Sequence, residues 1–152
     1  MKTLVIFDST WGNTEKIARV IGGTVSGEVK IIRVGEVNIA ELKNFDLIFF
    51  GSPTLGGRPT ENMQNLLNDI SENAIKSVRF ASFDTRLTSR WVSIFGYTAA
   101  KINENLKNKG AKPVAPPEGF FVKSREGPLK DGELERAVSW VKSISTTFAS
   151  QA

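Results

Sequence analysis

The chain has 152 residues, a formal net charge of +4 and an apolar fraction of 40%, as expected for one ordinary globular domain. It contains neither cysteine nor histidine. That excludes disulfides, thiol nucleophiles, iron–sulfur clusters and Ser-His-Asp hydrolysis, and it argues strongly against zinc and haem sites. Any redox chemistry therefore requires a bound organic cofactor.

The first half of the chain alternates between predicted strands and helices. Apolar runs typical of buried parallel strands occupy residues 3–7 and 46–50, and residues 29–34 predict a short strand between them. Residues 40–42 indicate a half-helical crossover. Apolar residues at helical spacing predict two helices, one from Ile17, Val20 and Ile21 and the other from Met63, Leu66, Leu67 and Ile70.

The second half continues this alternation. Residues 78–83 form another apolar run, and residues 97–109 predict a helix. Residues 112–122 predict a last strand that a proline pair interrupts. Asp131 is predicted to cap the final helix, whose apolar stripe consists of Leu134, Val138, Val141, Ile144 and Phe148.

This alternation predicts an α/β fold, a three-layer, doubly wound, five-stranded parallel sheet with helices on both faces. Residues 1–149 are expected to form one domain and residues 150–152 a frayed tail. No stretch approaches the roughly 18–20 apolar residues of a membrane span, and no signal peptide is evident, so we expect a cytoplasmic protein. The net charge fits either a mildly basic surface or an acidic partner, and no nucleic-acid-binding motif accompanies it.

The segment that follows the first predicted strand is rich in hydroxyl groups. It lies where a helix begins, and there the backbone N–H groups lack intrahelical partners and favour an anion. Ser9, Thr10 and Thr14 add hydroxyl donors, and Gly12 allows close approach of the backbone. The segment lacks both the nucleoside-triphosphate loop and the dinucleotide fingerprint. It therefore suits a phosphate monoester that is held by neutral donors.

This segment resembles the phosphate loop of the flavodoxin family, which has the pattern Thr/Ser-x-Thr-Gly-x-Thr. The chain has Ser9-Thr10-Trp11-Gly12-Asn13-Thr14 and departs from many flavodoxins at Trp11, where one hydroxyl is lost. The resemblance implies a flavodoxin-like sheet of strand order 2-1-3-4-5 and one bound FMN. In such sheets FMN binds at the switch point between strands 1 and 3, as it does in flavodoxins themselves.

A second segment is similar to a flavin loop of the same family, with the pattern Gly-Thr/Ser-Pro-Thr-x-Gly. It follows the predicted strand at residues 46–50. The resemblance implies that Leu55 covers one face of the flavin ring, where flavodoxins often have an aromatic residue. The flavin-binding residues expected in this loop are Ser52, Pro53, Thr54, Leu55, Gly56 and Gly57.

The other flavin loop is expected after the fourth strand, although its sequence does not match the short glycine-rich version of the family. Asp84, Thr85 and Arg86 are expected to contact the edge of the flavin ring. Trp91 is a candidate for stacking on the second ring face. Packing of Trp91 on the following helix is an equally simple interpretation, and the sequence leaves both open.

Three arginines distinguish the flavin loops from the acidic surroundings that are typical of flavodoxins, namely Arg58, Arg86 and Arg90. A nearby cation stabilises a reduced, anionic flavin, so we expect a less strongly reducing couple and a redox protein partner of acidic character. The favoured function is electron transfer through bound FMN. The alternatives are a small FMN-dependent oxidoreductase acting on a quinone, a porphyrin precursor or NAD(P)H, and a binding module that has lost its flavin.

Overall fold

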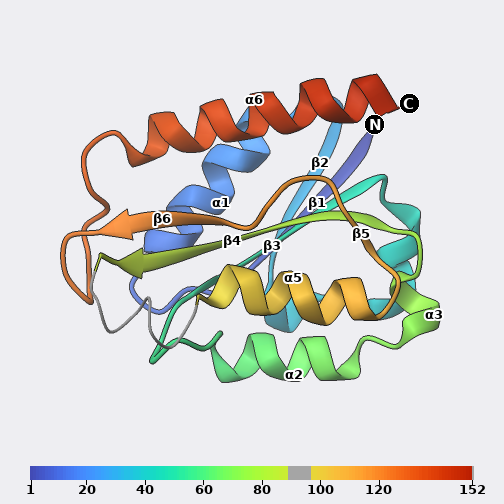
Figure 1. Ribbon diagram of the computed structural model, residues 1–152, viewed down its shortest axis with the longest axis horizontal. Coiled ribbons are helices and arrows are strands. Elements are labelled where there is room, and N and C mark those ends of the chain that lie inside the picture. Colours follow the sequence, from blue (N-terminus) through green and yellow to red (C-terminus); the bar gives the residue numbers. More distant parts are fainter. Residues whose placement is uncertain (89–96, 152) are drawn as a thin grey trace.

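The computed structural model describes residues 1–88 and 97–151, and its centre is one parallel sheet (Figure 1). The strand order is β2-β1-β3-β4-β5, with β6 also paired to β4. All pairings between strands are parallel, which confirms the predicted doubly wound topology. The strands are β1 (Lys2–Phe7), β2 (Glu28–Arg33), β3 (Leu47–Pro53), β4 (Arg79–Leu87), β5 (Lys112–Pro113) and β6 (Glu118–Val122).

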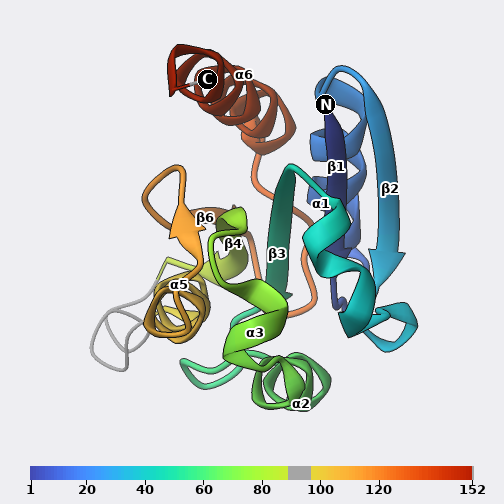
Figure 2. The same ribbon diagram turned by 90° about the vertical axis from the view of Figure 1, so that its right-hand side faces the viewer.

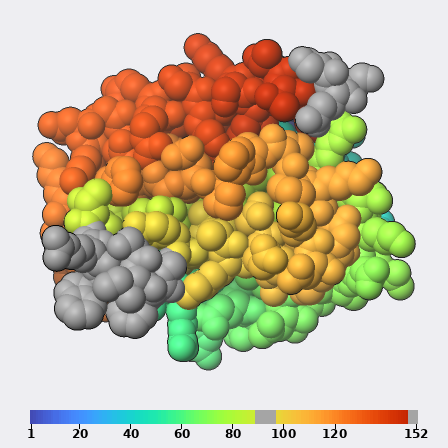
Figure 3. Space-filling view, viewed as in Figure 1, coloured from blue at the N-terminus to red at the C-terminus, as the bar shows by residue number. Residues whose placement is uncertain are grey.

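The fifth strand position is divided into two segments on the same edge of β4. β5 pairs with the beginning of β4, and β6 pairs with its end, from Phe83 to Leu87. Pro116 and Pro117 lie between the segments, and proline supplies no N–H to a strand ladder. Figure 3 shows the chain from α5 to β6 at the surface, below α6. The predicted interruption is therefore confirmed, with five strand positions built from six strands.

Helices cover both faces of the sheet (Figures 1 and 2). α1 (Asn13–Thr24) and α6 (Glu133–Gln151) cover one face, and α2 (Glu61–Asp69), α3 (Glu72–Ile75) and α5 (Thr98–Asn108) cover the other. Two short 3₁₀ helices, η1 (Val34–Glu36) and η2 (Ile39–Asn44), form the predicted crossover into β3. Each face has its own apolar core, one around Met63 and Ile102 and the other around Ile17 and Trp140.

The beginning of α6 differs from the prediction in two ways. Gly132, not Asp131, precedes the helix, and its carbonyl accepts the first helical hydrogen bond; the Asp131 side chain is fully exposed. Leu134 is 39% exposed, although it was expected in the apolar stripe. The reason is that Glu133 takes the inward position, where its carboxylate accepts a hydrogen bond from the N–H of Phe121 at 2.7 Å. Val141 and Ile144 of the predicted stripe are buried, together with Ala137 and Trp140, which were not predicted to belong to it.

The carboxyl ends of β1, β3, β4 and β6 meet at one edge of the sheet, which is the left side of Figure 1. The last strand residues, Pro53 of β3 and Leu87 of β4, extend further than predicted and carry the candidate loops with them. Within the described residues, no helix is both long and apolar enough to cross a membrane. The edge of the sheet where the strands end is therefore the expected position of a binding site.

Candidate functional site

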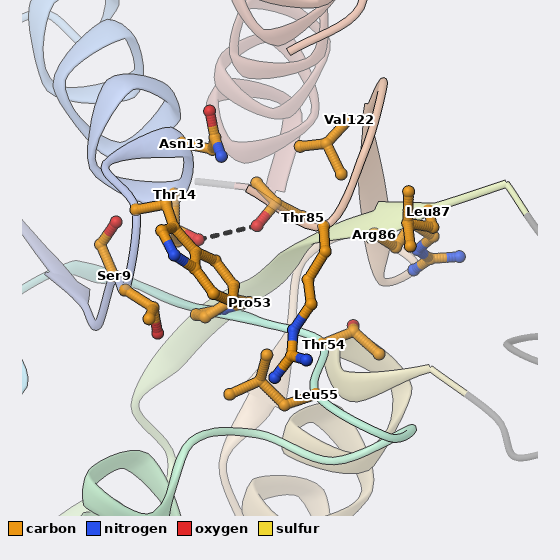
Figure 4. Close-up of a pocket in the computed structure, with 13 residues that line it drawn as sticks. Ser9, Asn13, Thr14, Pro53, Thr54, Leu55, Thr85, Arg86, Leu87 and Val122 are labelled. Carbon is orange, nitrogen blue, oxygen red and sulfur yellow. Dashed lines mark hydrogen bonds between the residues drawn. The ribbon is translucent and has the colours of Figure 1, made fainter. Parts of the chain in front are cut away.

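A cleft lies at this edge between the β1–α1 loop, the ends of β3 and β4, and the loop after β6 (Figure 4). It contains about 380 Å³ of space, part of it open to solvent. Ten of the residues expected to bind the cofactor line it, together with three that were not expected. The lining residues are Ser9, Thr10, Trp11, Asn13, Thr14, Pro53, Thr54, Leu55, Thr85, Arg86, Leu87, Val122 and Arg125.

The loop from Ser9 to Thr14 has the geometry of an anion site. Gly12 adopts a φ of +92°, a left-handed conformation that favours glycine, and α1 begins at the next residue. The Ser9 hydroxyl oxygen accepts a hydrogen bond from the N–H of Gly12 at 3.0 Å. Within the described chain, no hydrogen bond uses the backbone N–H groups of Thr10, Trp11, Asn13 and Thr14. These free donors, at the positive end of the α1 dipole, are suited to a phosphate.

Hydroxyl groups connect the first loop to the ends of the central strands. The hydroxyls of Thr14 and Thr85 lie 2.8 Å apart and form a buried hydrogen bond (Figure 4). The N–H of Thr54 donates to the carbonyl of Thr85 at 2.9 Å. The Thr54 hydroxyl oxygen is buried and has no hydrogen-bond partner within 3.5 Å among the described residues, although it lies near enough to Asp84 to lower that pKa.

Only part of the loop after β3 lines the cleft, and its other residues hold that part in place. Ser52 is fully buried; its hydroxyl donates to the carbonyl of Pro53 and accepts from the N–H of Thr60. Gly56 and Gly57 form a tight turn with φ values of +58° and +78°, closed by paired backbone hydrogen bonds between Leu55 and Arg58. Among the residues expected to contact the cofactor, Ser52, Gly56 and Gly57 therefore do not line the cleft. They position Pro53, Thr54 and Leu55, which do.

At the end of β4, Arg86 lines the cleft as expected, whereas Asp84 is buried behind it. The Asp84 carboxylate is fully buried and accepts hydrogen bonds from the Arg86 guanidinium at 2.7 and 2.8 Å and from the N–H of Ala99 at 2.8 Å. Burial raises the pKa of Asp84, and Arg86, Ala99 and Thr54 oppose that rise. Arg86 also stacks on Tyr97, with its guanidinium carbon 3.5 Å from the ring centroid. Asp84 thus caps α5 and neutralises Arg86, and it does not line the cleft.

The other charged residues expected near the flavin lie elsewhere. Arg58 is exposed on the loop after β3 and is not among the residues that line the cleft. Trp91 and Arg90 lie outside the described residues. Arg86 was expected to be a free cation beside the ring, but it is paired with Asp84.

Carboxylates beside the first loop are balanced by arginines. Arg33, which ends β2, lies 3.7 Å from the carboxylate of Asp8 and 3.1 Å from that of Glu15, and it donates to the carbonyl of Ser9. Arg19 pairs with Glu15 at 2.7 Å. This network offsets negative charge that would otherwise repel an anion at the start of α1.

Three residues that line the cleft were not expected from the sequence: Leu87, Val122 and Arg125. Leu87 becomes visible only when the end of β4 is known, because that strand was expected to end at residue 83. Val122 ends its strand as predicted but was not assigned to the site. Arg125 belongs to the loop between β6 and α6, and its guanidinium carbon lies 5.4 Å from the centroid of the Trp11 indole. No local motif marks this loop, because its position depends on a contact with a segment more than a hundred residues earlier.

Comparisons with known proteins agree with this geometry. The family model described as flavodoxin matches residues 5–140. The chain belongs to the flavodoxin family. A flavodoxin of Maridesulfovibrio salexigens is 29% identical, with 95% of this chain and 97% of the relative covered. Proteins of this family bind FMN.

Solved structures of flavodoxins share the fold. A flavodoxin from the domain Archaea has a TM-score of 0.81 at 22% identity and covers 98% of this chain and 99% of its own. Rubredoxin oxygen:oxidoreductase from Desulfovibrio gigas has a TM-score of 0.73 at 20% identity; 98% of this chain matches 36% of that longer one. The free N–H groups and the hydroxyls of the Ser9–Thr14 loop form a donor set that fits the phosphate of FMN.

Proposed function

We propose that the chain binds one FMN in this cleft and carries electrons between redox protein partners. The observation that carries the proposal is the loop from Ser9 to Thr14, whose unpaired N–H groups line a cleft shared with the ends of β3 and β4. In the family to which the chain belongs, the bound FMN supplies the electron-transfer chemistry. The residues of the chain bind the flavin, orient it and exclude water.

Residues around the cleft divide into three groups. The free N–H groups of the first loop, with the hydroxyls of Ser9, Thr10 and Thr14, would hold the phosphate. Pro53, Thr54, Leu55, Leu87 and Val122 would surround the ring. Trp91 remains our candidate for the second ring face. Ser52, Gly56, Gly57 and Asp84 would act indirectly, by fixing the loops that contact the flavin. The Asn13 side chain would act in the same way on the loop after β6, while its backbone N–H faces the phosphate.

Electron transfer is favoured over the oxidoreductase alternative by the composition of the cleft. Among the described residues that line it, none has a carboxylate, and the chain contains no imidazole or thiol. Substrate turnover usually needs such a proton donor or acceptor, whereas an electron carrier does not. The exposed Arg58 and Lys101 support an acidic redox partner, and the cysteine-free composition supports a cytoplasmic location.

The test is a titration of the apoprotein with FMN, riboflavin and FAD, followed by visible absorbance and fluorescence. Preferential binding of FMN over riboflavin is expected, because riboflavin lacks the phosphate. Thr10→Val should lower the affinity for FMN and leave the affinity for riboflavin unchanged. The matched control is Thr24→Val, which removes a hydroxyl that donates to the carbonyl of Val20 at the far end of α1. No flavin binding by the wild-type protein would refute the proposal. Rapid NAD(P)H oxidation with quinone acceptors would favour the enzyme alternative.

A further inference from the structure

The loop between β6 and α6 is a closed turn that packs on the first loop. The N–H of Lys123 donates to the carbonyl of Pro128 at 2.8 Å, and the N–H of Gly127 donates to that of Ser124 at 3.0 Å. The Asn13 side-chain amide donates to the carbonyl of Glu126 at 3.1 Å. This tertiary hydrogen bond joins two segments that are 113 residues apart in the sequence, and it lies beside the start of α1.

Gly127 makes this contact possible. A Cβ at this position would lie 2.6 Å from the side-chain oxygen of Asn13, and the backbone adopts a φ of +105°, where side chains are strained. The turn therefore approaches Asn13 more closely than any other residue type would allow. This approach carries Arg125 to the cleft, over the indole of Trp11.

Among the residues that the structure describes, the arginines that line the cleft are Arg86 and Arg125, and their electrostatic states differ. Arg86 is paired with the buried carboxylate of Asp84. Arg125 has no carboxylate within 4.0 Å among the described residues, and its guanidinium lies over the Trp11 ring. A cation–π contact at an exposed site is weak, so the guanidinium is free to leave the ring for an anion. Its planar set of N–H donors matches the oxygens of a phosphate.

We propose that Arg125 binds the phosphate of FMN and is held beside it by the contact of Asn13 with Glu126. The inference rests on the proposed function. It adds one full positive charge to a phosphate loop that otherwise offers neutral hydroxyls and N–H groups. FMN affinity then depends on the charge of the phosphate, and it falls as salt screens that charge.

Equilibrium titration of the apoprotein with FMN and riboflavin tests the role. Arg125→Gln should weaken FMN about tenfold, which corresponds to about 1.4 kcal/mol, and leave riboflavin affinity unchanged. Arg125→Lys should recover part of the loss. Arg79→Gln is the matched control, because Arg79 also stacks on an aromatic ring, Phe148, but lies at the start of β4, at the opposite edge of the sheet. The salt dependence of FMN affinity should be weaker in Arg125→Gln than in Arg79→Gln.

The outcomes separate this inference from the proposed function. Failure of the wild-type protein to bind FMN would refute both. Normal FMN binding by the wild-type protein with an unchanged FMN-to-riboflavin ratio in Arg125→Gln would refute the role of Arg125 alone. Equal weakening of both flavins would also refute it, because it would show that Arg125 acts on the ring or on the loop packing. A loss confined to FMN would support it.

Discussion

Thr14, in the first turn of α1, and Thr85, near the end of β4, share a buried hydrogen bond between hydroxyls that lie 2.8 Å apart. Their exposed fractions are 1% and 4%. One hydroxyl donates to the other, so one hydrogen remains free to be donated elsewhere. Both residues line the cleft. The same hydrogen bond therefore contributes to the stability of the apoprotein and determines which hydroxyl hydrogen remains available to donate to FMN.

Replacing Thr85 with valine should destabilise the apoprotein by about 1–2 kcal/mol, because the Thr14 hydroxyl would be left buried without a partner. Chemical denaturation measures the loss. Thr3→Val is the control: the Thr3 hydroxyl is fully buried and unpaired among the described residues, so its removal should cost less than about 0.5 kcal/mol or stabilise the protein. The double variant of Thr14 and Thr85 should lose less than the sum of the single variants. Equal losses in the Thr3 and Thr85 variants would contradict this reasoning.

Glu133 should make the protein less stable in acid. Burial alone would raise its pKa, but hydrogen bonds from Arg136 and from the N–H of Phe121, together with the charges of Arg136 and Lys130, lower it below the ordinary 4.5. A lowered native pKa contributes stability above 4.5 that is lost as the pH falls through the native value.

The Glu133→Gln variant should therefore be less stable than the wild type at neutral pH, by about 2 kcal/mol. The difference should shrink as the pH falls below 4.5, the ordinary value for this carboxyl. Denaturation curves at several pH values measure it. The Glu135→Gln variant, at an exposed position in the same helical turn, should show a much smaller difference. A constant difference between wild type and Glu133→Gln across this range would count against the assigned contacts.

Asp84 should give the opposite slope. Burial raises its native pKa above the ordinary 3.8, so the folded protein binds a proton more readily than the unfolded chain. The resulting contribution is fully present below 3.8 and is lost as the pH rises through the native value. In Asp84→Asn this part of the pH dependence should disappear, while Asp69→Asn, an exposed position on α2, should keep it. Parallel stability profiles for the wild type and Asp84→Asn would show that the carboxyl does not titrate as inferred.

The sequence predicted the parts of the site that depend on local signals. The Ser9–Thr14 loop combines a strand end, a glycine and a helix start, and the structure places five of its six residues on the cleft. Asp84 was assigned to a flavin loop because its strand was expected to end at residue 83, whereas β4 continues to Leu87 and buries it. Arg125 was missed because its position follows from the tertiary contact of Asn13 with Glu126, which leaves no pattern in the chain.

The first turn of α6 was mispredicted for a related reason, whereas Val141, Ile144 and Phe148 face the core as predicted. Periodicity placed Leu134 inward, because a leucine at helical spacing is normally apolar core. The structure gives the inward position to Glu133, since Arg136 and the N–H of Phe121 satisfy its carboxylate. Such a buried charge is stable only with these partners, and one of them, Phe121, belongs to a different element, β6. The spacing of apolar residues in the sequence does not reveal these partners, so it could not predict a buried glutamate at this position.

Arg58 is the remaining exposed cation for which the sequence suggested an effect on the flavin potential. Its side chain has no ion pair among the described residues, and its backbone is bonded to Leu55 beside the cleft. At roughly 10 Å in water, one charge contributes about 0.4 kcal/mol, or about 20 mV for one electron. Arg58→Ala should therefore lower the midpoint potential of bound FMN by about 20 mV, and potentiometric titration can resolve this. Arg79→Ala, at the far edge of the sheet, should leave the potential unchanged. An unchanged potential in Arg58→Ala would mean that the charge is fully screened, and the partly basic loops would then act on the partner and not on the flavin. A raised potential would contradict the electrostatic role of Arg58 outright.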